Sequence, residues 1–138
     1  MKTEINIYVL IGMLLIHWLA DFVMQTDKMA RGKSTSNIQL TSHVFMYSSI
    51  WSSCCSIYVW FFYVTNIDGT YSMLPNGNKL LILFPAITFV CHWITDYFTS
   101  RLNSKLWLDG KVHLFFVSIG FDQILHYIQL LVTFQLLS

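Results

Sequence analysis

The sequence predicts an all-α fold, and more specifically an integral membrane four-helix bundle built from two helical hairpins in weak internal repeat. Composition is the first reason, because 11% of the 138 residues are charged and 55% are hydrophobic, whereas a soluble domain carries roughly 25% charged residues. The second reason is a set of four apolar runs, each with about the 20 residues that a helix needs to cross a hydrocarbon core. The mean hydropathy of +0.55 points the same way. We therefore expect residues 1–138 to form a single transmembrane domain.

The four apolar runs set the predicted helix bounds. The helices are expected at about residues 5–24, 38–64, 80–98 and 112–137, with polar connections at 25–37, 65–79 and 100–111. The first and third helices superpose at an offset of 75 residues, which aligns His17 with His92 and gives the internal repeat. A cleaved signal peptide is the alternative for the first helix, but its start is barely basic and no small-residue cleavage site follows.

Basic residues are concentrated in two of the predicted connections. Six of the eight Lys and Arg residues lie in the first and third connections, at positions 28, 31, 33, 101, 105 and 111. Because the cytoplasmic loops of membrane proteins carry an excess of Lys and Arg, these connections should face the cytoplasm and both termini should lie outside it. The lipid bilayer is then the expected partner. A net charge of +1 leaves no basic surface for nucleic acid, so no nucleic-acid partner is expected.

Three of the predicted helices pair an imidazole with a carboxylate. The pairs are His17 with Asp21, His92 with Asp96 and, in reverse order, Asp122 with His126. Because residues i and i+4 share one face of an α-helix, the two polar groups of a pair point the same way. The remaining helix carries His43 in its first two turns. A carboxylate at the centre of a bilayer costs a few kcal/mol even on the mildest scale, so these three need a compensating partner or a function.

Metal ligation is the leading interpretation of these groups. The predicted topology places all of them in the cytoplasmic half of the bundle, where they can meet at one depth. The predicted ligands are His17, Asp21, His43, His92, Asp96, Asp122 and His126. This set suits divalent zinc, manganese or iron, with zinc or manganese favoured, and is large enough for one or two ions. The alternatives are polar groups that only hydrogen-bond across the bundle, and a proton or ion relay.

The same elements carry a family resemblance. The motifs are His17-x-x-x-Asp21-Phe22-x-x-Gln25, the isolated His43, His92-x-x-x-Asp96 followed by Ser100-Arg101-Leu102, and Phe121-Asp122-Gln123-x-x-His126. Together they resemble the DUF3307 family of small bacterial and phage-encoded membrane proteins, over nearly the whole chain. The resemblance implies a multi-pass protein of the bacterial inner membrane. Many members carry Lys three residues after the second Asp, where this chain has Thr99. If that Lys contacts an anionic substrate in the family, the role is either missing here or passes to Arg101.

The family pattern is similar in style to that of YdjM-like membrane proteins, described as metal-dependent hydrolases. By this analogy the leading hypothesis is hydrolysis of a lipid or lipid-linked phosphate or ester, in which the metal lowers the pKa of a bound water toward about 7. His43 would be either a further ligand or the catalytic general base, and His113 a substrate contact. The alternative is a non-catalytic phage membrane protein that acts on the host envelope through a host membrane protein. Association into a homo-oligomer is a further expectation.

Overall fold

The computed structural model of this chain describes residues 6–65 and 77–137, and over these residues it is all-helical, with no strand. Its elements are α1 (Ile7–Trp18), the π-helix η1 (Leu19–Val23), α2 (Asp27–Gly32), α3 (Asn37–Thr65), α4 (Gly77–Leu108) and α5 (Val112–Leu137). The predicted all-α class is therefore confirmed for the described residues.

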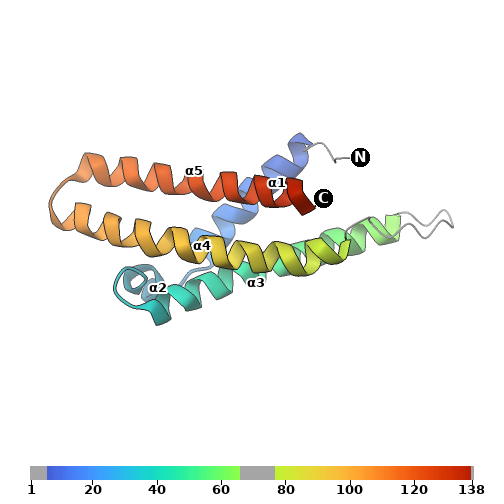
Figure 1. The fold of residues 1–138 in the computed structure, drawn as a ribbon, viewed down its shortest axis with the longest axis horizontal. Helices are drawn as coiled ribbons and strands as arrows, with labels where there is room; N and C mark the ends of the chain where they lie inside the picture. The colour runs from blue at the N-terminus through green and yellow to red at the C-terminus, as the bar shows by residue number, and fades with distance from the viewer. Residues whose placement is uncertain (1–5, 66–76, 138) are drawn as a thin grey trace.

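The helix α4 is the centre of the fold. Figure 1 shows α3, α4 and α5 running side by side with α4 between the other two, while α1 crosses behind α5. A tight turn at residues 109–111 joins α4 and α5 into an antiparallel hairpin. The short helix α2 lies toward the same end of the fold as this turn, and the two chain ends lie toward the opposite end.

Two of the predicted helices match the structure closely. The ranges predicted as 38–64 and 112–137 correspond to α3 and α5 to within one residue at each end. The first predicted helix is described from Ile7, and after Trp18 it continues as a π-helix. The predicted connection 25–37 contains a helix that the sequence did not predict, α2, whose N-cap Thr26 accepts a hydrogen bond at Oγ1 from the backbone N–H of Met29, 3.3 Å away.

The third helix is longer than predicted, because α4 covers Gly77–Leu108 where residues 80–98 were expected. The prediction of a connection at 100–111 is therefore wrong for all but its last three residues. The apolar run ends near residue 98, but residues 99–108 contain no Gly or Pro and include Leu, Arg and Lys, which favour continuation of the helix. Arg101 also ties this extension to the preceding turn, since it donates to the carbonyl of Tyr97 at 2.8 Å and lies 3.7 Å from the centre of the Tyr97 ring. Of the predicted connection 65–79, residues 66–76 lie outside the described residues.

Two helices, α4 and α5, are long and apolar enough to cross a membrane, judged by length and composition alone. The segment Ile7–Val23 is a shorter apolar helix. The buried apolar core includes Met13, Tyr47, Trp51 and Phe84, which α1, α3 and α4 contribute. This core holds together the helices that carry the polar pairs.

The turn between α4 and α5 depends on one glycine. Gly110 has a φ of +68°, in the left-handed region where a side chain is unfavourable. Its N–H donates to the carbonyl of Trp107 at 3.1 Å, and the N–H of Lys111 donates to the carbonyl of Leu106 at 2.9 Å. These two hydrogen bonds form a Schellman cap that ends α4 and turns the chain toward α5.

We expect Gly110→Ala to lower the free energy of unfolding by about 1 kcal/mol, because alanine is strained at this φ. The measurement is thermal or denaturant unfolding of the purified protein in detergent. The matched control is Gly120→Ala, since Gly120 is an exposed residue inside α5 where an added Cβ meets no other atom within 4 Å. The control should be neutral or slightly stabilising. Equal stability of the two variants would contradict this role for Gly110.

Candidate metal centre

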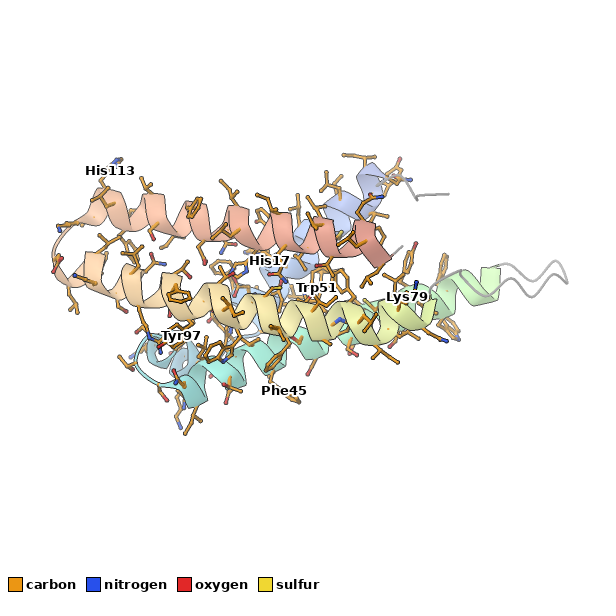
Figure 2. All side chains as sticks on the ribbon, in the orientation of Figure 1. His17, Phe45, Trp51, Lys79, Tyr97 and His113 are labelled. Atoms are coloured by element: carbon orange, nitrogen blue, oxygen red, sulfur yellow. The ribbon has the colours of Figure 1, made fainter. Side chains whose placement is uncertain are left out.

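The structure brings the seven predicted side chains into one buried cluster at the middle of the bundle. His17 comes from α1, Asp21 from η1, His43 from α3, His92 and Asp96 from α4, and Asp122 and His126 from α5. All four imidazoles have no exposed surface, and the carboxylates of these three aspartates are buried too. Figure 2 shows His17 pointing into the space between the helices. The i, i+4 spacing thus turns both groups of each pair inward, as predicted.

Asp21 sits in a widened turn of the first helical segment. The backbone N–H of Met24 donates to the carbonyl of Leu19 at 2.9 Å, which is the i to i+5 pattern of a π-helix. Such turns occur frequently at functional sites because they re-aim single side chains. Here the carboxylate of Asp21 points toward the histidines of α3 and α4, while its Oδ2 lies 3.8 Å from Nε2 of His17.

Four of the buried groups form a first set with the spacing of a tetrahedral metal site. Its members are Asp21, His43, His92 and Asp96, whose ligand atoms all lie within 4.8 Å of one another. Oδ1 of Asp21 lies 3.0 Å from Nε2 of His43 and 3.5 Å from Nε2 of His92. Oδ2 of Asp96 lies 3.4 Å from Nε2 of His43 and 3.6 Å from Nε2 of His92. The two Nε2 atoms are 3.3 Å apart. Metal–ligand distances of about 2.0–2.2 Å give a tetrahedron with edges of roughly 3.3–3.6 Å. The donor atoms therefore fit a divalent ion with little rearrangement.

A second set shares Asp96 with the first. Oδ1 of Asp96 lies 3.3 Å from Nε2 of His126, and Nε2 of His126 lies 3.4 Å from Oδ1 of Asp122. The three residues form a second group with metal-ligand spacing. Asp96 thus points one oxygen at each group, as a carboxylate between two ions would. The second group offers three ligands where the first offers four, and Asp122, with 10% of its side chain exposed, is its most accessible member.

His17 belongs to neither group, because both of its ring nitrogens have other partners. Its Nδ1 accepts a hydrogen bond from the hydroxyl of Tyr47 at 2.7 Å, and its Nε2 donates to Oε1 of Gln123 at 3.0 Å. The amide nitrogen of Gln123 then donates to Asp122 at 3.3 Å and lies 3.5 Å from Asp21. In this arrangement His17 orients Gln123, which spans two of the carboxylates.

Tyr47 and Gln123 are site residues that the sequence reasoning missed. The ring of Tyr47 stacks on that of His92 with centroids 4.0 Å apart, while its hydroxyl contacts His17. A signal was present, since Tyr47 follows His43 by four residues and therefore lies on the same helix face. Gln123 stands next to Asp122 in the motif that carries the family resemblance, but its position beside Asp122 gave no indication that it reaches across to α1 and η1.

Lys33 is the third missed residue and the only Lys or Arg that contacts the cluster within the described residues. Its Nζ donates to Oδ2 of Asp96 at 2.9 Å, and its carbonyl accepts from Ser100 at 3.5 Å. Burial lowers the pKa of Lys33, but the charges of Asp96 and Asp21 outweigh this effect and raise the pKa above its ordinary value. The sequence placed Lys33 in a predicted cytoplasmic connection, where nothing in the pattern indicated that it reaches Asp96 and Ser100 of α4.

The two residues weighed for substrate contact, His113 and Arg101, lie away from the cluster, as does Thr99. His113 is exposed near the start of α5, and Figure 2 shows it at the far end of the bundle, pointing outward. Arg101 stacks on Tyr97 and donates to Asn37 at 2.8 Å. Thr99 donates to the carbonyl of Thr95 within its own helix. None of the contacts of these side chains reaches the His and Asp groups.

The charges of the cluster match those of one divalent ion. With the carboxylates of Asp21, Asp96 and Asp122 ionised and the imidazoles neutral, Lys33 leaves the cluster with a net charge of −2. The Nδ1 atoms of His43, His92 and His126 are buried with no hydrogen-bond partner among the described residues, so these rings make their polar contacts through Nε2, toward the cluster. A buried cluster of this charge requires a cation, protonation or both.

We expect Lys33→Met to destabilise the metal-free protein by about 3 kcal/mol, because it removes a cation from a buried carboxylate. The measurement is thermal unfolding in detergent with a chelator present. Adding zinc or manganese should recover more stability in this variant than in the wild type, since the ion restores the missing positive charge. The control is Lys28→Met on the exposed face of α2, which should change stability by about 0.5 kcal/mol or less. Equal stability of both variants would show that the Lys33–Asp96 pair contributes nothing.

The comparisons with known proteins identify the family. A family model described as "Protein of unknown function (DUF3307)" matches residues 9–138, a range that contains Lys33 and all seven clustered His and Asp residues. No curated protein and no solved structure matches the chain. The match covers almost the full length and agrees with the resemblance found in the His and Asp motifs. This chain therefore belongs to the DUF3307 family.

Proposed function

We propose that this protein is a multi-pass membrane protein that holds a divalent metal near the cytoplasmic face and hydrolyses a lipid or lipid-linked ester or phosphate. The observation that carries the proposal is the spacing of the first set of ligand atoms. Two carboxylate oxygens and two imidazole nitrogens lie within 4.8 Å of one another, with contacts of 3.0–3.6 Å that are close to the edges of a tetrahedral site, and all four side chains are buried. The Nε2 atoms of His43 and His92 lie 3.3 Å apart, and each also lies 3.0–3.6 Å from carboxylate oxygens of Asp21 and Asp96.

The outer surface of the bundle supports a lipid environment. Large apolar side chains point outward along α4 and α5, among them Ile82 at 69%, Phe98 at 66% and Phe116 at 62% exposure. A soluble monomer rarely exposes so extensive an apolar surface. Both chain ends lie toward one end of the fold, and the turn between α4 and α5, with its basic residues, lies at the other. This arrangement is consistent with a cytoplasmic turn and external termini.

The two groups of ligands suit different roles. The first offers four protein ligands, which is the closed arrangement typical of a site that holds its ion firmly. The second offers three, which leaves a position for water or substrate, as catalytic sites do. A divalent ion there would lower the pKa of a bound water and polarise the group to be cleaved. Asp96 would connect the two groups through its two oxygens.

The remaining residues of the cluster position these ligands. His43 has its Nε2 inside the first group and 3.0 Å from Asp21, so its position favours the role of ligand over that of general base. His17 and Tyr47 hold Gln123, which in turn holds Asp122. Lys33 lies beside Asp96, where its ammonium group can also contact an anionic substrate.

A proton or ion relay is the second candidate, and one observation favours it. The titratable groups form an unbroken series of contacts of 3.4 Å or less, from Lys33 through Asp96 and His126 to Asp122. Such series serve proton transfer in membrane proteins. A relay needs no bound metal, so the metal experiment below separates the two candidates.

The topology can be tested with fusion reporters. A reporter attached after Ser138 should give a periplasmic signal, and one inserted beside Lys33 should give a cytoplasmic signal, because the basic residues keep their connections inside. Reporter activity at both positions in a bacterial host is the measurement. A cytoplasmic signal at Ser138 would overturn the assignment of the cluster to the cytoplasmic half.

The metal site can be tested by unfolding with and without a chelator. Zinc or manganese at about a hundredfold excess over Kd should add roughly 2.7 kcal/mol to the free energy of unfolding of the wild type. Asp21→Asn should abolish this gain, because it removes the charge of a ligand while keeping its shape. Asp122→Asn should keep the stabilisation by an ion bound in the first group of ligands, since Asp122 belongs only to the second group.

The matched control is Asp27→Asn, an exposed aspartate of α2 whose partner is Arg31 at 3.5 Å. It should respond to metal like the wild type. Elemental analysis of the same samples gives the number of ions per chain. If no ion binds and a chelator has no effect on any variant, metal-dependent hydrolysis is excluded and the relay becomes the leading candidate.

A further inference from the structure

A cavity of about 320 Å³ lies among the helices and has almost entirely apolar walls. The residues that matter for its role are Gly12, Met13, Ile16, Trp51, Phe84 and Phe134, which come from α1, α3, α4 and α5. Its size is at the lower end of the range for small-molecule pockets, about 300–1,000 Å³. None of these residues is among the proposed metal ligands, so the hydrolysis chemistry by itself does not account for the cavity.

The cavity and the cluster are neighbours along α1 and α3. Ile16 comes directly before His17 on α1 and Met13 lies one turn before it, while Trp51 follows Tyr47 by one turn on α3. On α4 and α5 the cavity residues lie farther from the paired groups but toward the same end of the bundle, the end that holds the chain termini. Figure 2 shows Trp51 beside His17, on the side of Lys79.

Two aromatic side chains, Trp51 in the cavity wall and Tyr47 next to it, connect the cavity to the ligands through ring contacts. Trp51 lies 5.2 Å from Phe84, ring centre to ring centre, and 6.4 Å from Tyr47. Tyr47 in turn stacks on His92 of the first group at 4.0 Å. An apolar chain in the cavity would therefore end within two side chains of the metal ligands, with a polar head on the side of the cluster.

We propose that the cavity binds an acyl chain of a membrane lipid whose head group reaches the His and Asp cluster. This inference rests on the proposed function and names its substrate class. The apolar walls exclude a polar ligand, because a polar group buried there would lack hydrogen-bond partners. The orientation also matches the bilayer. With the cluster toward the cytoplasmic face and the cavity toward the midplane, a lipid of the cytoplasmic leaflet has its head and its chain in the corresponding places.

Gly12 offers a way to fill the cavity without disturbing the helices. A Cβ added at Gly12 meets no atom within 4 Å, and Gly12 is part of the cavity wall. Gly120 has the same open space around its Cβ but lies on the exposed face of α5, outside the cavity wall. Gly12→Leu and Gly120→Leu are therefore the same substitution in two apolar helices, and only the first occupies the space proposed for the chain.

The test uses proteoliposomes of phosphatidylethanolamine and phosphatidylglycerol that contain a small fraction of phosphatidylglycerol with a diazirine in mid-chain. After irradiation, mass spectrometry should find adducts on the cavity residue Met13, with adducts on the lipid-facing Phe116 as internal reference. Relative to that reference, Gly12→Leu should reduce Met13 labelling on the order of tenfold, the effect of losing burial of about two methylene groups. Gly120→Leu should leave it unchanged. If Gly12→Leu does not fold, Phe134→Trp fills the cavity from the opposite wall and should give the same loss.

Absence of Met13 adducts, or equal labelling in all variants, would overturn the acyl-chain site. The metal measurements keep this outcome separate from the proposed function. Gly12→Leu should retain the stabilisation by zinc or manganese, while Asp21→Asn should lose it and still show Met13 labelling. Metal binding without cavity labelling rejects the lipid site alone, and cavity labelling without metal binding rejects the hydrolase alone.

Discussion

The burial of three carboxylates among apolar helices is the constraint on which the rest of this structure depends. Asp21, Asp96 and Asp122 come from three different elements, and at most 7% of the surface of each whole residue is exposed. Leaving such groups unpaired costs several kcal/mol each, more than a domain of this size can absorb. The helices therefore place an imidazole beside every carboxylate, and Lys33, at the end of α2, adds its ammonium group. The π-turn and the position of α2 both serve this pairing.

Much of this arrangement could be predicted from the spacing of a few residues. His and Asp four residues apart in an apolar run must share a helix face, so the inward direction of His92 and Asp96 follows from sequence alone. Their meeting with His43 followed from the need to bury polar groups away from the apolar outer surface of the helices. The spacing could not predict which of these side chains belong to the two sets of ligands and which do not. His17 and His126 are each paired with a carboxylate four residues away, in opposite order along the chain. Of the two, only His126 has its Nε2 directed at two carboxylates, because Tyr47 and Gln123 engage the nitrogens of His17.

The parts that could not be predicted are those where polar segments fold onto the bundle. An apolar run marks the length that suits a bilayer but not the length of the helix, which is why α4 extends ten residues past the predicted end at residue 98. Lys33 follows a short helix that has no buried residue, so no hydrophobic pattern predicts its contact with Asp96. Such contacts are set by tertiary electrostatics and leave no periodic signal in the sequence.

In the proposed function, charge also links the number of metal ions to the substrate. With its imidazoles neutral, as metal ligands must be, the cluster with Lys33 carries a net charge of −2, so one divalent ion would neutralise it, and the closed first group is the natural place for that ion. A second ion in the open group would leave a buried excess of positive charge, which is as costly as the negative charge it replaced. An anionic lipid head group arriving beside Asp122 would supply the missing negative charge. Occupancy of the open group should therefore rise when such a substrate binds, while the first ion stays in place with or without it.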